Sequence, residues 1–93
     1  MMIDSTQTQE INETKIVAQE TFKIVLYNDD YNTFGHVIEC MVKYCKMDTI
    51  QGEQIAWLVH HVGKAIVKEG DFSDLEPICT ALCDNDLSAS IEL

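Results

Sequence analysis

The sequence predicts a small single α+β domain in which a three-stranded antiparallel sheet carries three helices on one face. Three stretches, at 21–27, 64–67 and 87–93, are β-branched or alternate apolar with polar residues, as strands do. The stretches between them repeat apolar residues three and four positions apart, which is the spacing of one helical face. The order strand-helix-helix-strand-helix-strand leaves roughly seventy residues for one core.

The first twenty residues do not share these patterns. They are rich in Gln, Thr, Glu and Asn, have no sustained apolar face, and set four acids against the single Lys15. Such a composition cannot bury enough apolar surface to offset the entropy of ordering. We therefore expect residues 1–20 to form a flexible N-terminal arm and residues 21–93 to form the domain.

The first strand leads into a polar turn. Residues 21–27 are apolar and β-branched, whereas Asn28, Asp29 and Asp30 favour turns because their side chains bond to nearby backbone. Asn32 is the expected N-cap of the helix that follows. The apolar face of that helix comprises Phe34, Val37, Ile38, Met41 and Cys45.

A capping box opens the second helix. Asp48 is followed three residues later by Gln51, and Gly63 is the natural stop. Ala56 and His60 fall together on one flank of the apolar face, so His60 is expected at its rim. The predicted face itself comprises Ile55, Leu58, Val59 and Val62.

The last third of the chain supplies the remaining helix and two strands. A short strand at 64–67 is followed by a turn at 68–72, and Ser73 with Glu76 forms a second capping box. Alternation over 87–93 predicts a strand with one apolar face. The helix before it is expected to bury Leu75, Ile78, Cys79 and Leu82.

Composition excludes several classes of function. The formal charge is −10, from sixteen acids against six lysines with no arginine, which makes nucleic acid a poor partner. No apolar run approaches a membrane span, and no secretory leader is visible, so we expect a cytoplasmic, reduced protein without a membrane partner. The four cysteines follow neither zinc nor redox spacing, so no metal or cofactor is expected.

The acidic turn is the first candidate for function. It lies at a strand-to-helix junction, where side chains are exposed on a rigid support and binding residues often occur. The plain structural alternative is that Asn28, Asp29 and Asp30 only end the strand and place negative charge at the next helix start. The turn alone does not decide between the two.

Two motifs in this order resemble one family. Tyr27-Asn28-Asp29-Asp30-Tyr31 before an amphipathic helix, then Val59-His60-His61-Val62-Gly63-Lys64-Ala65-Ile66, then a Ser-Ile-Glu strand at the C-terminus, resemble ClpS, the adaptor of the ATP-dependent Clp protease. The resemblance covers 22–67 and 87–92. It implies a monomeric, non-catalytic adaptor that binds proteins with an N-terminal Leu, Phe, Tyr or Trp and delivers them to a ClpA- or ClpC-type AAA+ unfoldase.

The resemblance also implies a site for a free N-terminus. Asn28, Asp29 and a neutral His60 are the acceptors for the α-ammonium group, and such groups can supply the lone pairs that a cation needs. An acetylated or internal peptide would leave these acceptors unpaired, at about 1–3 kcal/mol each. The hydrophobic pocket for the first side chain would be formed by Phe34, Val37, Ile38, Ala56, Val59 and Leu87.

The chain departs from the family pattern in places. Thr33 replaces a usual Pro, while Phe34 and Ala56 stand where Met commonly lines the pocket mouth. The segment 68–85 is shorter than is typical, which truncates the helix that contributes to docking on the unfoldase.

Two other functions stay open. One is a small interaction domain of the same fold that does not bind N-termini. The other is a hydrolase that assembles Asp29, His60 and Cys40 or Cys45. The discriminating observation is whether Asn28, Asp29 and His60 converge at one apolar pocket, or whether a thiol lies there.

Overall fold

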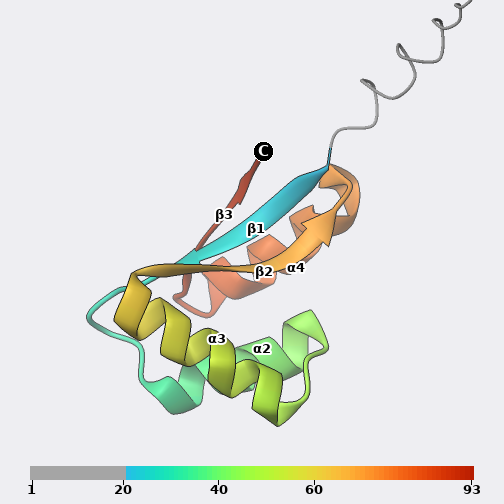
Figure 1. The fold of residues 1–93 in the computed structure, drawn as a ribbon. Helices are drawn as coiled ribbons and strands as arrows, with labels where there is room; N and C mark the ends of the chain where they lie inside the picture. The colour runs from blue at the N-terminus through green and yellow to red at the C-terminus, as the bar shows by residue number, and fades with distance from the viewer. Residues whose placement is uncertain (1–20) are drawn as a thin grey trace, which may run out of the picture.

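The computed structural model describes residues 21–93; the arm predicted at 1–20 lies outside them. The elements are β1 (Phe22–Tyr27), α2 (Phe34–Cys45), α3 (Thr49–Val62), β2 (Lys64–Gly70), α4 (Phe72–Asp84) and β3 (Ser88–Glu92). The strands form one antiparallel sheet in the order β2-β1-β3, with the helices beneath it in Figure 1. The predicted α+β fold and element order are confirmed.

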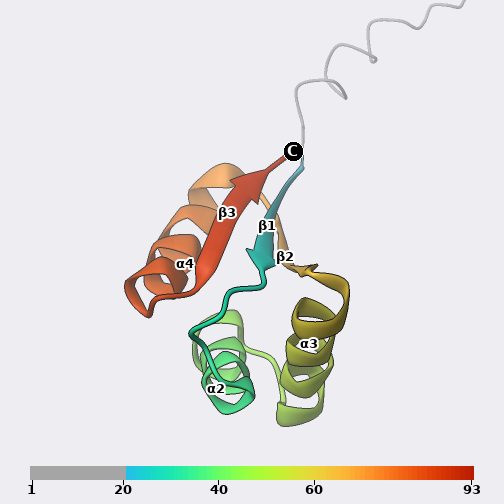
Figure 2. The same cartoon turned by 90° about the vertical axis from the view of Figure 1, so that its left-hand side faces the viewer.

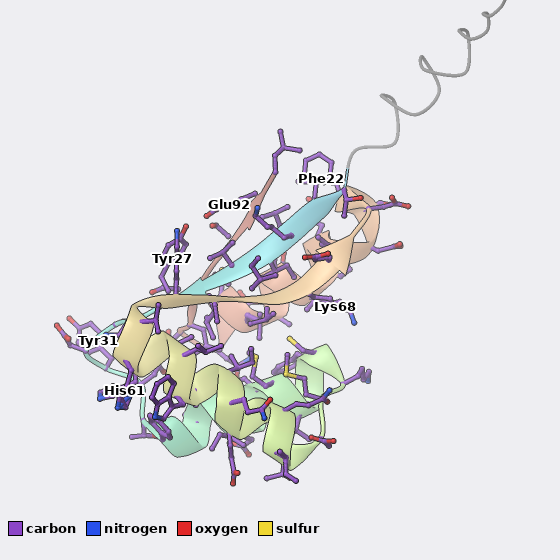
Figure 3. The ribbon with its side chains drawn as sticks, viewed as in Figure 1. Phe22, Tyr27, Tyr31, His61, Lys68 and Glu92 are labelled. Carbon is purple, nitrogen blue, oxygen red and sulfur yellow. The ribbon has the colours of Figure 1, made fainter. Side chains whose placement is uncertain are left out.

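Strand β1 is the centre of the sheet because β2 and β3 pair with its two edges. Its side chains alternate between the faces. Ile24 and Leu26 are fully buried with Met41, Leu75 and Leu82 from the helices. The other face, which carries Tyr27, looks away from α2 and α3 (Figure 3).

Strand β2 extends three residues beyond the predicted strand, through the segment expected as a turn. Lys68, Glu69 and Gly70 pair with the first three residues of β1, and this pairing outweighs the turn preference of Gly70. Ile24 pairs with Lys68 but Val25 pairs with Ile66, so Val67 is the extra residue of a bulge. Val67 is nonetheless buried.

Two helix starts differ from the sequence prediction. Thr33, not Asn32, is the N-cap of α2, and its Oγ1 accepts the backbone N–H of His36 at 3.1 Å. Helix α4 begins at Phe72 after Asp71 rather than at a capping box on Ser73, so Pro77 lies inside the helix. Of the face predicted for α4, Leu75, Cys79 and Leu82 are buried and Ile78 is partly buried. The capping box of Asp48 and Gln51 and the stop at Gly63 are also confirmed.

The buried face of helix α3 is shifted from the one predicted. Val59 is buried and Ile55 is partly buried, as predicted, but Leu58 and Val62 are exposed. Gly52 and Ala56 are buried in their place. A Cβ atom added at Gly52 would lie 3.2 Å from the side chain of Ile38 on α2. Small residues thus let α3 approach α2 closely, and this packing overrides the larger apolar side chains. No helix within 21–93 has the length and apolarity needed to cross a membrane.

Candidate functional site

A small cavity lies where β1 runs into the polar loop. Figure 2 looks onto this end of the molecule, where the loop, α2, α3 and the turn into β3 come together. The cavity encloses about 20 Å³, which is room for about one water molecule. It is lined by Leu26, Tyr27, Asn28, Asp29, Asn32, Val37, Val59 and Leu87. An apolar floor therefore meets a polar rim at the predicted turn.

Asp29 organises that rim. Its Oδ1 accepts the backbone N–H of Tyr31 at 2.9 Å and that of Asn32 at 2.8 Å, and its Oδ2 accepts Asn32 Nδ2 at 2.7 Å. A carboxylate offers about four lone-pair positions. Three are used within the loop, so one remains on Oδ2 for a further donor.

Asp29 is held in its charged form. Partial burial acts to raise the pKa of its carboxyl group, but the hydrogen bonds from Asn32 and Tyr31 and the nearby His36 outweigh it. The pKa of Asp29 therefore lies below its ordinary value of 3.8. A fixed anion with a spare lone pair is suited to a cationic ligand.

Asn32 is a site residue that the sequence reasoning assigned to a helix cap. Its Nδ2 donates to Asp29 and also, at 2.9 Å, to the backbone carbonyl of Asp86. Asp86 immediately precedes Leu87 in the cavity wall, so Asn32 ties the loop to that wall. The Asp-x-x-Asn spacing of 29 and 32 could have indicated the side-chain pair, but nothing local indicates the bond to residue 86.

The backbone N–H of Asn28 donates to the carbonyl of Gly63 at 2.9 Å. This bond joins the start of the loop to the end of α3. The Asn28 side chain is exposed and, within residues 21–93, its amide makes no hydrogen bond. Its carbonyl oxygen is thus open to a ligand.

His60 lies in the last turn of α3 at the edge of this region but does not line the cavity. Its ring contacts Phe34 edge-on at a centroid distance of 5.7 Å and His61 at 5.0 Å. No hydrogen bond from its ring nitrogens is found in the described part of the chain. The structure thus brings Asn28 and Asp29 to one cavity and places His60 beside it, across from Phe34.

The predicted pocket residues divide into two groups. Val37, Val59 and Leu87 are buried and line the cavity. Phe34, Ile38 and Ala56 do not line it. They lie along the seam between α2 and α3. On the α2 side, Ile38 faces Gly52 and Phe34 faces His60. Ala56 lies between Gly52 and His60 along α3. Ala56 is only 2 % exposed, so it is a core residue rather than part of the rim.

The cysteines do not join this constellation. Cys40 Sγ lies 3.7 Å from His36 Nε2, and that nitrogen also lies 2.8 Å from the backbone carbonyl of Asn85. Burial raises the pKa of the Cys40 and Cys45 thiols, which disfavours the thiolate that a nucleophile needs. Within residues 21–93, no cluster of His, Cys, Asp or Glu is arranged to hold a metal ion.

Comparison with known sequences gives one consistent family. Residues 17–90 match the profile described as "ATP-dependent Clp protease adaptor protein ClpS". An adapter protein ClpS of Nostoc sp. is 41 % identical over 63 residues, covering 63 % of this chain and 62 % of the relative. A ClpS of Shewanella halifaxensis is 35 % identical over 60 residues, covering 64 % and 59 %. The matches thus span about three fifths of the relatives' length.

Among solved structures, the chain is similar to ClpS2 of Agrobacterium tumefaciens bound to L-phenylalaninamide. The TM-score is 0.76 at 21 % sequence identity, and the alignment covers 80 % of this chain and 96 % of the other. At this identity the likeness is one of fold.

Proposed function

Because the chain belongs to the ClpS family of Clp protease adaptor proteins, we propose that it binds proteins through a bulky apolar or aromatic N-terminal residue and delivers them to a Clp AAA+ unfoldase. Adaptors of this family are not enzymes, so the discrimination rests on binding alone. The observation that carries the proposal is that Asn28 and the ionised Asp29 border one apolar cavity.

The α-ammonium group is the feature that distinguishes a free N-terminus from any other peptide position. In the proposed complex it donates to the spare lone pair of Asp29 Oδ2, to the Asn28 side-chain oxygen and to a neutral His60 nitrogen. Hydrogen bonds to charged groups contribute about 1.5–3 kcal/mol each. The acetylated terminus of an otherwise identical peptide has neither the charge nor the donors.

The first side chain enters the cavity between Val37, Val59 and Leu87. As it stands the cavity holds about 20 Å³, whereas a benzene-sized ring needs about 150 Å³. The pocket therefore has to widen on binding. We place the widening along the seam of Phe34, Ile38 and Ala56, because the loop side is fixed by hydrogen bonds. The solved neighbour's ligand, L-phenylalaninamide, has the free ammonium and aromatic side chain that such a pocket would take.

The test is a titration of peptides that differ only in the first residue. Peptides beginning with Leu, Phe, Tyr or Trp are expected to bind, and those beginning with Ala, Gly or Asp are not. N-acetylated copies of the binders serve as matched controls and are expected to lose most of their affinity. Equal affinity for free and acetylated peptides would refute the ammonium site. If none of the peptides binds, the result would favour the alternative function, a small interaction domain of this fold that does not bind N-termini.

A further inference from the structure

Asn32 uses both hydrogens of its side-chain amide at the candidate site. Its Nδ2 donates to Asp29 Oδ2 at 2.7 Å and to the backbone carbonyl of Asp86 at 2.9 Å. An amide nitrogen has two donors, so both are occupied before any ligand binds. A hydroxyl group in the same place has one hydrogen and could serve only one of the two acceptors. Among short side chains, the two bonds together therefore require an amide.

The bond to Asp29 sets the plane of its carboxylate. Oδ1 accepts the backbone N–H groups of Tyr31 and Asn32, at 2.9 and 2.8 Å, and these bonds fix that one oxygen. A carboxylate that is held at one oxygen can still rotate about it. The bond from Asn32 Nδ2 fixes the second oxygen, and with it the direction of the lone pair that Oδ2 has left. Asn32 thus determines where the charged acceptor points.

The bond to Asp86 fixes the opposite wall of the cavity. Asp86 lies in the turn between α4 and β3 and has a φ of 69°, in the left-handed region that residues other than glycine seldom occupy. The next residue, Leu87, is buried in the cavity wall. In Figure 2 this turn lies beside the loop that follows β1. Asn32 therefore joins two segments that are 54 positions apart in the chain.

Asn85 is a second amide that donates twice in the same turn. Its Nδ2 donates to Tyr44 Oη at 3.1 Å and to the backbone carbonyl of Ala81 at 2.8 Å. These bonds tie the turn to α2 and to α4 rather than to the loop. Asn85 makes no hydrogen bond to Asp29 and does not line the cavity. Of the two amides that hold this turn, only Asn32 reaches the proposed acceptor.

We propose that Asn32 is a positioning residue for the ammonium group of a bound N-terminus, because it directs the free lone pair of Asp29 and holds this carboxylate at a fixed place relative to Leu87. The inference rests on the proposed function. The ammonium group and the side chain of a first residue are attached to one Cα, so the sites that bind them must keep a fixed separation. Asn32 spans these two sites and acts on the ligand through Asp29.

The test compares Asn32→Ala with Asn85→Ala as its matched control. Each variant removes two hydrogen bonds from one Nδ2 group, and the backbone hydrogen bonds that hold residues 85–87 to α4 involve neither side chain. For each protein, the Kd of an N-acetylated Phe-initiated peptide is divided by the Kd of its free copy. This acetyl ratio reports recognition of the ammonium group, because the peptides are otherwise identical.

The acetyl ratio should fall by roughly fivefold or more in Asn32→Ala, the scale of one lost hydrogen bond, and stay within about twofold in Asn85→Ala. A merely structural contribution would lower the affinity for both peptides and leave their ratio unchanged. An acetyl ratio in Asn32→Ala that equals that of the unaltered protein, or that falls equally in both variants, would overturn the proposal.

A double-mutant cycle separates positioning from direct contact with the ligand. If Asn32 acts through Asp29, then adding Asn32→Ala to Asp29→Ala should change the acetyl ratio by less than about twofold, because the group that Asn32 positions is already gone. A further fall as large as the one in the unaltered background would show that Asn32 contacts the ammonium group itself, and would overturn the proposal.

The Asp29 carboxyl group gives a readout that needs no peptide. Partial burial acts to raise its pKa, and the side-chain bond from Asn32 is one of the hydrogen bonds that lower it. In a ¹³C NMR titration this pKa should therefore be higher in Asn32→Ala than in the unaltered protein, and unchanged in Asn85→Ala. The same pKa in all three proteins would overturn the proposal.

The outcomes for the unaltered protein separate this inference from the function on which it rests. Equal affinity for free and acetylated peptides in that protein would refute the ammonium site, and the role of Asn32 with it. An unaltered protein that discriminates between the peptides, together with an Asn32→Ala variant that discriminates equally well, would overturn the role of Asn32 alone.

Discussion

The two sides of the proposed site are built in different ways. On the loop side, Asp29 accepts three hydrogen bonds and Asn32 ties the turn to Asp86. On the helix side, His60 is positioned by ring contacts with Phe34 and His61. The loop is thus held in one geometry by hydrogen bonds, before any ligand binds. The helix side is held by packing, which can adjust as the cavity widens.

Under the proposed function, this difference assigns separate tasks to the two sides. We expect the fixed carboxylate to decide whether a terminus binds at all, since its geometry and charge are set before the ligand arrives. We expect the packed seam between α2 and α3 to decide which side chain fits. Variants on the loop side should therefore change affinity for every peptide, and variants on the seam should change the ranking among peptides.

The largest effect on peptide affinity is expected from a substitution on the loop side. Asp29→Ala removes the charged acceptor and the three hydrogen bonds that shape the loop, so a Phe-initiated peptide should bind about 1.5–3 kcal/mol more weakly. Calorimetric titration measures this as roughly a 10- to 150-fold rise in Kd. Asp30→Ala is the matched control, because Asp30 is the adjacent exposed carboxylate and does not line the cavity. Equal losses in the two variants would contradict a specific role for Asp29.

The seam is tested by Ala56→Met. Ala56 is 2 % exposed, so the larger side chain overpacks the seam and should lower stability by about 1–3 kcal/mol. It should also raise the ratio of Leu- to Ile-peptide affinity, because a narrower seam penalises a β-branched side chain. Thermal unfolding and paired titrations measure the two effects.

The control for Ala56→Met lies at the other end of the same seam. Gly52→Val crowds Ile38, whose Cγ2 is 3.2 Å from the position of a Cβ at residue 52. It should lose comparable stability without changing the Leu to Ile ratio. If both variants leave that ratio unaltered, Ala56 does not shape the pocket.

A smaller effect is expected from His60. His60→Ala removes one neutral acceptor of the ammonium group, so peptide affinity should fall by about 1.5 kcal/mol, the low end of the range for hydrogen bonds to charged groups. His61→Ala removes a ring that contacts His60 but no proposed acceptor, so it should cost less. Calorimetric titration of a Phe-initiated peptide measures the loss in each variant. Equal losses in His60→Ala and His61→Ala would contradict an acceptor role for His60.

The direction of the pKa shift of Asp29 sets the pH dependence of its contribution. Its pKa is lowered below 3.8, so its contribution is complete above that value and is lost only as the pH falls through the lowered pKa. Asp29 thus remains charged over the whole range from pH 8 to 5. The difference in peptide affinity between the unaltered protein and Asp29→Ala should therefore be the same at pH 8 and at pH 5.

The smallest effect is a change in stability, and it is expected from Tyr27 at the end of β1, just before the loop. Tyr27 Oη donates to Glu92 Oε2 at 2.5 Å, and Ser90 Oγ donates to the same oxygen. The Tyr27 hydrogen bond is the main cause that lowers the pKa of Glu92 below 4.5, and the same bond raises that of Tyr27 above 10.0.

The hydrogen bond between Tyr27 and Glu92 contributes its full stability between the ordinary pKa values of the two groups, 4.5 for Glu92 and 10.0 for Tyr27. This stability is lost as the pH falls through the lowered pKa of Glu92 or rises through the raised pKa of Tyr27. Tyr27→Phe should slightly lower the midpoint of thermal unfolding at pH 7. It should also make that midpoint decrease less at acidic and alkaline pH than it does in the unaltered protein. Peptide affinity should not change. Scanning calorimetry across pH measures this, and an identical profile in the variant would exclude the contribution.

Local signals account for what the sequence predicted correctly. The capping box of Asp48 and Gln51 and the stop at Gly63 depend on residues within one helix, and the structure has them where expected. The cap of α2 shows the limit of such signals, since Asn32 and Thr33 are both good caps. Asn32 is instead used by Asp29 and Asp86, and the second of these contacts spans 54 positions.

Helix α3 shows why the packing beside the candidate site is harder to predict than the fold. Hydrophobicity favoured Leu58 and Val62 for burial, but the close approach of α2 requires small residues and selects Gly52 and Ala56. Interhelical distance is not encoded in the periodicity of one helix. The position of Ala56 relative to the cavity, and the exposure of Leu58 and Val62, follow from that distance.

The central place of β1 has a mechanical consequence. Strand β1 is the first element of the described domain, and it is bonded along both edges by β2 and β3. A pulling force applied to the N-terminal end of β1 therefore loads two ladders of hydrogen bonds at once, whereas an edge strand would have only one. We expect the domain to resist extraction from this end more than it would if its first strand lay at the edge of the sheet.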